Sequence, residues 1–262
     1  MSLIDKTIGA SLIDILQMNN SNNGIDTTAR YLVDGEGTQS ALKISDDVVS
    51  VRPNNDNTTG SFNVVSTSGT SILAVDTTNE LVKASGNTVN TQYSQFNIGS
   101  TESTQFADDT HQAIPFESAN YSLVSVPPAF GTGTDPATTF TTEDTNGLRG
   151  CDIVPCLWYI QDNISIDSVI SLEGADADAS DTTRMHLMSY DFTANSASIL
   201  SSGTLLAYSA DITNAGATKG YSSTWTIDSA SVTAGKVVVA TFESDSVYSD
   251  YSINLVVKYH LS

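Results

Sequence analysis

The last strand-like segment of the chain alternates strictly between two kinds of side chain over eleven residues, 251–261. Polar residues occupy the even positions, with Val256 as the one apolar exception. Successive side chains of a β-strand point to opposite faces, so this period predicts a strand with one buried face. The apolar positions are Tyr251, Ile253, Leu255, Val257, Tyr259 and Leu261.

The rest of the second half of the chain has the same character. Segment 236–243 is apolar on both faces, as a central strand between two layers would be. Ser and Thr make up about a quarter of the chain and only 15% of residues are charged, a composition that favours β-rich surface proteins. We therefore expect an all-β chain whose residues 106–262 form an antiparallel jelly-roll β-sandwich. The further predicted strands are 121–126, 156–160, 164–172, 183–190, 197–208 and 221–227.

The N-terminal residues 1–24 read differently, because apolar residues recur at helical spacing over 3–18. A short helix of this kind needs a partner surface, which is either another protein or its own domain. The segment lacks the basic start and uninterrupted apolar core of a signal peptide. We interpret 1–24 as an anchoring segment, ended by the Asn- and Ser-rich run 19–24. The predicted docking residues are Ile4, Ile8, Leu12 and Leu16.

Between these parts, residues 25–105 contain short β-like runs separated by polar turns. Each run offers only two or three apolar side chains. Strands this short usually gain stability by stacking against copies of themselves or against other chains. The stretch 91–112 is rich in Gln, Ser, Thr and Asp, so we expect a linker or domain boundary there.

The segment from Phe62 to Lys83 reads FNVVSTSGTSILAVDTTNELVK. It resembles the recurrent β repeat of phage fibre and virion appendage proteins, through its Gly-Thr, the turn over 75–79 (VDTTN) and the short apolar strand that follows. The preceding ALKISDDVVSVRP resembles the companion strand pair of that repeat. The resemblance covers about a fifth of the chain and implies a trimeric β collar over 25–105. Because the repeat occurs once, a short collar is expected rather than a long shaft.

The resemblance implies a structural, non-enzymatic virion protein of a tailed phage. It would decorate or stabilise the capsid, or project as a short head or tail fibre. We expect a homotrimer at the particle surface, made in the host cytoplasm, with major capsid or tail proteins as partners. The predicted oligomer interface is the apolar face of the last strand, at Tyr251, Ile253, Leu255, Val257 and Tyr259.

Two alternatives stay open. One is a receptor-binding tail-fibre tip that recognises host-surface glycan through loops 128–147 and 173–182. The other is a bacterial carbohydrate-binding or glycan-degrading protein. Trp158 and Tyr159 are neighbours in one predicted strand and so point to opposite faces. We expect Trp225 in the core, whereas the remaining tyrosines either pack inside or stack on sugars. These are Tyr190, Tyr208, Tyr248 and Tyr251.

The net charge of −20 bears on partners. The ten basic residues are scattered, so no cluster exists to neutralise nucleic-acid phosphates. An anionic membrane surface would repel the chain, and no apolar stretch is long enough to cross a bilayer. We therefore expect neither nucleic acid nor membrane as a partner.

Motifs that carry catalysis or cofactors were not found. The sequence has no nucleophile elbow, H-E-x-x-H, P-loop or dinucleotide fingerprint, and its three histidines are predicted to be structural or solvent-facing. No cofactor is expected, apart from a weak Ca²⁺ candidate in the acidic loop, which otherwise is a solvated hairpin. Cys151 and Cys156 are expected as half-buried thiols or, alternatively, as a local disulfide. The Ca²⁺ candidates are Glu173, Asp176, Asp178 and Asp181.

Overall fold

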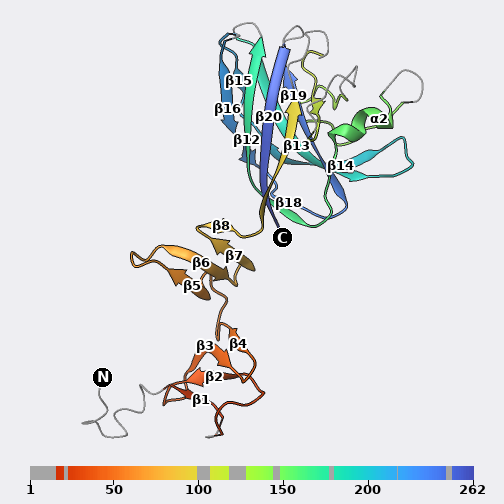
Figure 1. The fold of residues 1–262 in the computed structure, drawn as a ribbon. Helices are drawn as coiled ribbons and strands as arrows, with labels where there is room; N and C mark the ends of the chain where they lie inside the picture. The colour runs from red at the N-terminus through yellow and green to blue at the C-terminus, as the bar shows by residue number, and fades with distance from the viewer. Residues whose placement is uncertain are drawn as a thin grey trace. The chain divides into compact units, whose positions relative to one another are not determined.

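The chain is almost entirely antiparallel β-structure, as predicted (Figure 1). It divides into two units, Met1–Val89 and Asn90–Ser262. No helix in the described ranges is both long enough and apolar enough to cross a membrane. The computed structural model describes residues 16–20, 23–98, 107–117, 128–143, 148–176, 180–216, 218–245 and 250–262.

Unit 1 contains two four-stranded sheets, each a meander in chain order. The strands are short, at two to six residues each, because polar turn residues interrupt the apolar runs. The first sheet is β1 (Gln17–Met18), β2 (Arg30–Val33), β3 (Gln39–Ile44) and β4 (Val49–Val51). The second is β5 (Phe62–Val65), β6 (Ser71–Asp76), β7 (Leu81–Ala84) and β8 (Asn87–Thr88).

The helix predicted over 3–18 is wrong at its C-terminal end. Gln17 and Met18 form a strand that pairs with Leu32 and Val33 of β2. Pairing with a neighbouring strand outweighs the weak helical preference of so short a segment. The rest of the predicted helix, residues 3–15, lies outside the described residues.

The turn between β6 and β7 is built on the VDTTN segment. The carboxylate of Asp76 accepts hydrogen bonds from the backbone N–H groups of Thr78 and Asn79, at 3.1 and 3.0 Å. It also accepts from the side chains of Asn79 and Lys83, at 2.9 and 3.2 Å. A short side chain that bonds the backbone just ahead of it mimics a turn, which explains why Asp stands here.

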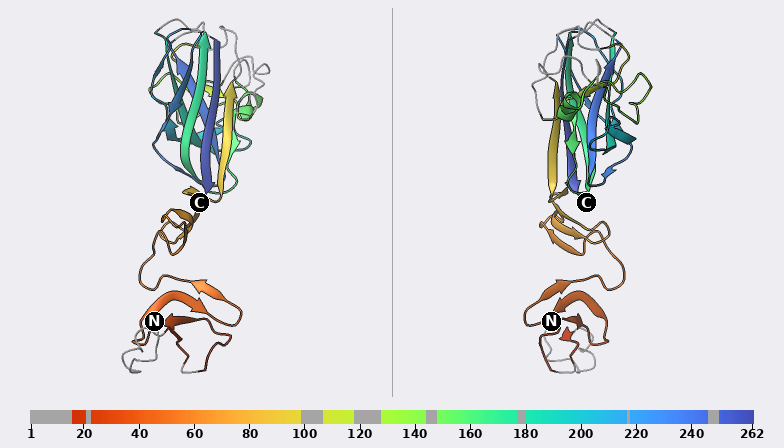
Figure 2. Two further views of the ribbon diagram at one scale, coloured as in Figure 1. Left: turned by 60° about the vertical axis from the view of Figure 1, so that its left-hand side comes forward. Right: turned by 90° about the vertical axis from the view of Figure 1, so that its right-hand side faces the viewer.

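Unit 2 consists of two antiparallel sheets, whose long strands run along its length in Figure 2. The five-stranded sheet has the order β16 (Gly220–Thr224), β12 (Ile164–Asp176), β20 (Asp250–Leu261) and β9 (Thr91–Ile98), with β18 (Ser231–Val232) beside β12. The seven-stranded sheet has the order β10 (Gln112–Ile114), β19 (Lys236–Ser244), β13 (Thr182–Phe192), β14 (Leu200–Tyr208) and β17 (Thr226–Ile227). Two short strands join it: β11 (Trp158–Tyr159) on β19 and β15 (Ile212–Thr213) on β13.

The main strands of unit 2 pair in a nested order: the first with the last, and each later strand with the next one in from the other end. β9 pairs with β20 and β10 with β19, whereas β12 pairs with β16 and β13 with β14. Along the chain, β9, β12, β16 and β20 belong to one sheet, and β10, β13, β14 and β19 belong to the other. The chain therefore crosses repeatedly between the two sheets.

The main core of unit 2 combines buried residues of both sheets. The inward face of β20 contributes five residues, and Trp225, buried as predicted, donates from its indole Nε1 to Ser171 Oγ at 3.0 Å. A second cluster includes Val237 and Val239, which alternate with the main-core residues Val238 and Ala240. Strand β19 is thus buried on both faces, as its sequence predicted. Covering this second face are loop residues Phe130 and Phe140, and Ile153 and Cys156 of α2 (Gly150–Ile153) and the 3-10 turn η2 (Val154–Cys156).

The linker predicted over 91–112 is wrong, because β9 occupies residues 91–98 and β10 begins at Gln112. The polar residues Gln92 and Gln95 that suggested a linker are exposed on β9, while Ser94, Phe96 and Ile98 are buried. Unit 2 consequently starts at Asn90 and not at residue 106. Of the other predicted strands, 121–126 lies outside the described residues, 156–160 shortens to β11, 197–208 shortens to β14, and 221–227 divides into β16 and β17.

Candidate functional site

The predicted oligomer interface on β20 is wrong. Its residues are buried in the main core of unit 2, where the ring of Tyr251 packs against Phe242 at 5.5 Å between centroids. The period of the sequence revealed a buried face, but it carried no information on whether that face meets another sheet or another chain. The five residues are Tyr251, Ile253, Leu255, Val257 and Tyr259.

The structure describes only one of the four predicted docking residues. Ile4, Ile8 and Leu12 lie outside the described residues. Leu16, directly before β1, has 69% of its surface exposed. The anchoring role of this segment stays a prediction.

The acidic loop is only partly described. Glu173 lies in β12 and is buried on its inward face, so it is part of the sandwich interior. Burial raises the pKa of its carboxyl group to about 7, against a hydrogen bond with Thr183 that lowers it. Asp181 is half-buried, whereas Asp178 and the side chain of Asp176 fall outside the description. Within the described ranges, no three His, Cys, Asp or Glu side chains are arranged to hold a metal ion.

Two histidines form a buried pair on the seven-stranded sheet. The rings of His111 and His186 meet edge to face, with 4.8 Å between centroids, and both residues are fully buried. The Nε2 atom of His111 lies 2.7 Å from the Gly133 carbonyl oxygen and 2.9 Å from Glu243 Oε2. Burial lowers the pKa of both rings, that of His186 to about 3. Both are therefore neutral at pH 7, and a structural role for these residues stays a prediction.

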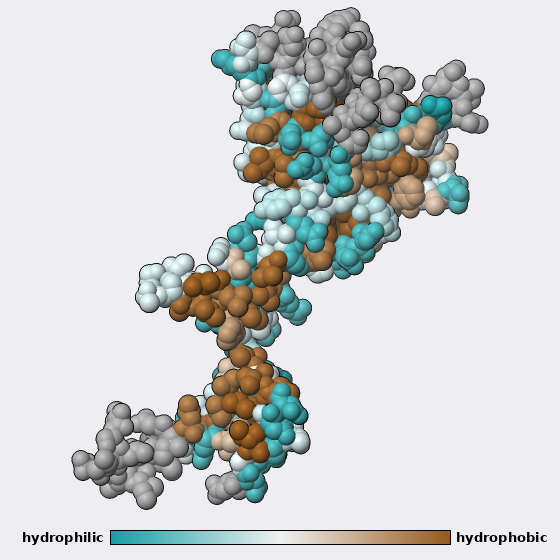
Figure 3. Space-filling view, viewed as in Figure 1, coloured by the Kyte–Doolittle hydropathy of each residue, from teal (hydrophilic) through white to brown (hydrophobic). Residues whose placement is uncertain are grey.

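Unit 1 leaves its apolar side chains exposed. All four residues of β5 are exposed, and among the described residues of unit 1 only one apolar residue, Val33, is buried. Figure 3 shows apolar surface over both small sheets. On the second sheet, Phe62 and Val82 both pair with Val75 and Val64 pairs with Leu73, so these three exposed side chains share one face, here called the collar face. Val65 and Ile72 of the same sheet are exposed as well.

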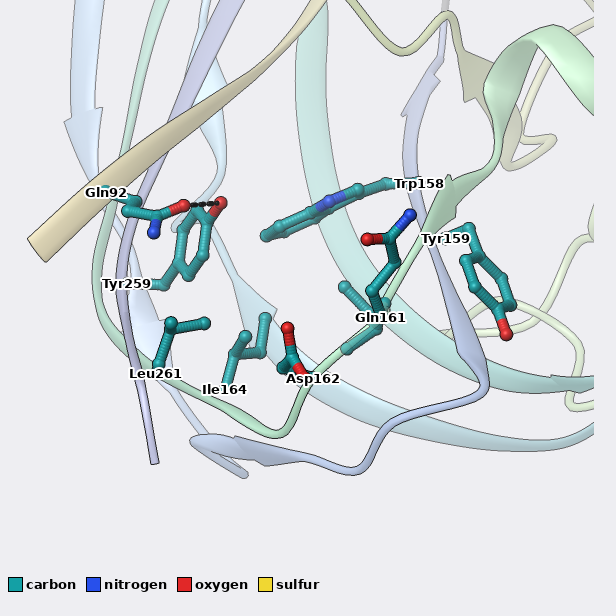
Figure 4. Close-up of a pocket in the computed structure, with 9 residues that line it drawn as sticks. Gln92, Trp158, Tyr159, Gln161, Asp162, Ile164, Tyr259 and Leu261 are labelled. Carbon is teal, nitrogen blue, oxygen red and sulfur yellow. Dashed lines mark hydrogen bonds between the residues drawn. The ribbon is translucent and has the colours of Figure 1, made fainter. Parts of the chain in front are cut away.

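Unit 2 has a pocket of about 240 Å³ at the edge of the sandwich, formed by segments far apart in sequence (Figure 4). Its floor is buried and apolar, with Trp158 and Tyr259 at 4.9 Å between ring centroids. The hydroxyl of Tyr259 donates to Gln92 Oε1 at 2.9 Å. The lining residues are Gln92, Trp158, Tyr159, Ile160, Gln161, Asp162, Ile164, Tyr259 and Leu261.

The sequence indicated part of this pocket. Alternation predicted that Trp158 and Tyr159 face opposite ways, and they are 7% and 55% exposed. In Figure 4 the Tyr159 ring points away from those of Trp158 and Tyr259. The polar residues Gln92, Gln161 and Asp162 were missed, because no local pattern links β9 to the turn before β12.

The other tyrosines and the two cysteines singled out in the sequence do not line this pocket. Tyr190 is buried, with its hydroxyl donating to the Ala137 carbonyl oxygen at 2.8 Å, and Tyr251 is buried too. Tyr208 is half-buried, and Tyr248 lies outside the described residues. Cys151 and Cys156 are both free thiols, one exposed and one buried, so the local disulfide does not form.

Comparison with known proteins found no protein-family model and no curated protein that matches this chain.

Proposed function

We propose that this chain is a structural, non-enzymatic protein at the surface of a tailed-phage particle. It is a homotrimer in which unit 1 forms a short collar and unit 2 a jelly-roll head. The collar is the part that associates, and the N-terminal segment 1–24 attaches it to a major capsid or tail protein. The observation that carries this proposal is the exposed apolar surface of unit 1.

A sheet as small as either sheet of unit 1 buries only a small fraction of its surface, so its stability is marginal unless its apolar side chains are covered. The collar face presents three large apolar side chains at 41–45% exposure. Val65 and Ile72 of the same sheet are 50% exposed, and Val49 of the first sheet reaches 70%. Each such side chain contributes roughly 1.5–3 kcal/mol when fully buried. Copies of one chain bring identical surfaces to a symmetry axis, so self-association covers the same apolar face in every copy.

The strand pairing of unit 2 supports the head. Counted along the eight main strands, the first pairs with the last, the second with the seventh, the third with the sixth and the fourth with the fifth. This nested order is that of a double-sheet jelly roll, a fold that viral capsid proteins and lectins use. Because one fold serves many functions, it favours a particle-surface role only together with the collar.

Light scattering after size exclusion tests the association. The full chain should have three times the monomer mass of 27.7 kDa at low micromolar concentration. Replacing Phe62 and Val64 with Asp places two charges in the collar face and should yield monomers. The matched control is Ile170→Asp, an exposed apolar residue of β12 in unit 2, which should stay trimeric. A monomeric wild type, or a trimeric double variant, would refute the collar.

The particle assignment has its own test. Mass spectrometry of purified phage particles from a producing strain should detect the chain, and electron microscopy with a specific antibody should place it on capsid or tail. Absence of the chain from particles that carry every other structural protein would overturn the assignment.

A further inference from the structure

We propose that the pocket at the edge of unit 2 binds a neutral sugar in its pyranose ring form. The pocket lies wholly within unit 2, so this inference does not depend on the collar or on the particle assignment. No sequence motif assigned a ligand to it.

The floor offers the surface that the C–H face of a sugar ring prefers. The negative faces of aromatic rings attract weakly positive C–H groups, and Trp158 and Tyr259 border the floor with the 7% and 9% of their surface that stays exposed. One side of the Trp158 indole is already occupied, because Phe116 stacks on it at 5.7 Å and an interplanar angle of 11°. In Figure 4 the rings of Trp158 and Tyr259 border one common space together with Ile164 and Asp162.

The rim offers hydrogen bonds of the kind that hydroxyl groups need. Gln92, Gln161 and Asp162 are exposed and polar, and together they supply both donors and acceptors. The lining contains no Lys, Arg or His, and the whole chain carries a net charge of −20. Phosphorylated, sulfated and carboxylated ligands are therefore repelled, and an uncharged polyhydroxy ring is the class that fits.

The rim is held in place before any ligand arrives. The backbone N–H of Ile160 donates to the carbonyl oxygen of Lys236, the first residue of β19, at 2.9 Å. The carbonyl oxygen of Ile160 accepts from the N–H of Gly235, in the β18–β19 connection, at 2.8 Å. Asn163 accepts from the Ala234 N–H at its side-chain Oδ1, at 2.9 Å, and from the Ser262 N–H at its carbonyl, at 3.0 Å. Residues 161–162 are thus clamped on both sides, which reduces the entropy that binding would otherwise cost.

The volume of the pocket limits the ligand. At about 240 Å³ it is smaller than the roughly 300–1,000 Å³ of sites for drug-sized ligands. It therefore takes one sugar unit, with neighbouring units of a longer glycan left in solvent.

Saturation-transfer NMR on the full-length protein tests the proposal directly. The probes are the methyl glycosides of glucose, galactose, mannose, N-acetylglucosamine and N-acetylgalactosamine, with sorbitol as an open-chain polyol. We expect transfer to at least one ring glycoside, strongest at its C–H protons, and none to sorbitol. Absence of transfer to all five glycosides at millimolar concentration would overturn the proposal.

Variants place the binding in this pocket. Gln161→Ala and Asp162→Asn alter exposed rim residues without touching the core, and each should weaken binding about three- to tenfold, as loss of one hydrogen bond does. The controls are Asp228→Asn, an exposed carboxylate outside the lining, and Tyr93→Ala, an exposed aromatic next to Gln92. If both rim variants bind as tightly as the controls, the sugar binds elsewhere and the assignment fails. The oligomeric mass of each variant is measured in parallel, so that failure of the collar and failure of the pocket give different results.

Discussion

Asp76 and Glu173 both have a buried carboxyl group, but their surroundings favour opposite protonation states. Asp76 in unit 1 accepts four hydrogen bonds, so its ionised form is well satisfied. Glu173 in unit 2 sits between the sheets, and its Oε2 atom has no hydrogen-bond partner among the described residues. The first group is stabilised as an anion and the second as a neutral acid, so they give opposite dependences on pH.

The Asp76 carboxylate should make the collar sensitive to acid. Hydrogen bonds from Asn79, and then from Lys83, lower its pKa from 3.8 to about 2. A lowered folded-state pKa contributes stability above pH 4 that is lost as the pH falls toward 2. Asp76→Ala should therefore lower the melting temperature at pH 7, with the difference from wild type shrinking below pH 4. The exposed Asp47→Ala serves as control, and an equal loss at pH 2 and pH 7 would contradict the mechanism.

Glu173 should give the opposite dependence of stability on pH. Because burial raises its pKa from 4.5 to about 7, the folded state holds the proton more tightly than the unfolded state. This contribution is complete below pH 4.5 and is lost as the pH rises through 7. Glu173→Gln keeps the shape without the charge, so its stability relative to wild type should grow between pH 4.5 and pH 8, by up to roughly 3 kcal/mol. Urea unfolding at both pH values measures this, with the exposed Glu143→Gln expected to show no such growth.

At the scale of elements, β14 lies unusually close to the loop that covers the outer core. The backbone N–H of Gly203 donates to the Thr138 carbonyl oxygen at 2.9 Å. A Cβ atom at Gly203 would lie 2.6 Å from Cε1 of Tyr190 and 2.7 Å from Cα of Thr138. The glycine is required because strand, loop and tyrosine ring meet there.

Substituting Gly203 should weaken the packing of loop 128–143 against β14. Gly203→Ala forces the backbone of loop 128–143 away from β14 and should destabilise unit 2 by about 1–3 kcal/mol. Gly174→Ala in β12 is the matched control, because a Cβ there meets nothing within 4 Å. Thermal unfolding of both variants compares them, and equal melting temperatures would show that the contact yields without cost.

At the scale of elements, the sequence correctly predicted the strands that have one apolar and one polar face, and the strand whose two faces are both apolar. Strands β12, β13, β19 and β20 follow directly from such patterns. β9 was missed because its exposed residues include Gln92 and Gln95, whose polar side chains are typical of a linker when the alternating buried residues are not recognised. The partner of the β20 face was misjudged, since period-two alternation is the same for a sandwich core and a chain-to-chain interface. The pocket joins β9, β11 and β20, which only the nested pairing brings together.

At the scale of the whole molecule, the two units have different means of stability. Unit 2 closes a core between two sheets and adds a second cluster on one outer face. Unit 1 exposes most of its large apolar side chains. Under the proposed function, the division of the chain at Val89 and Asn90 would also separate a unit that folds by itself from one whose folding needs other copies.

Separate expression of the two units should reveal this difference. Residues 90–262 should form a monomer with cooperative thermal unfolding and dispersed amide signals in NMR spectra. Residues 1–89 should have a melting temperature that rises with protein concentration, because association and folding are coupled. A trimeric 90–262 fragment would move the association surface to unit 2, and a concentration-independent melt of 1–89 would refute the coupling.

The nested pairing also sets the order of events during synthesis. The only ladder partner of β9 in the described part of the chain is β20, and the side chain of Asn90 bonds the Leu261 carbonyl oxygen across 171 residues. While the ribosome is still translating, β9 and β10 have emerged without their partner strands. Unit 2 must therefore complete its fold after its last strand is released, and during that interval its unpaired strand edges are open to chaperones, proteases and neighbouring nascent chains.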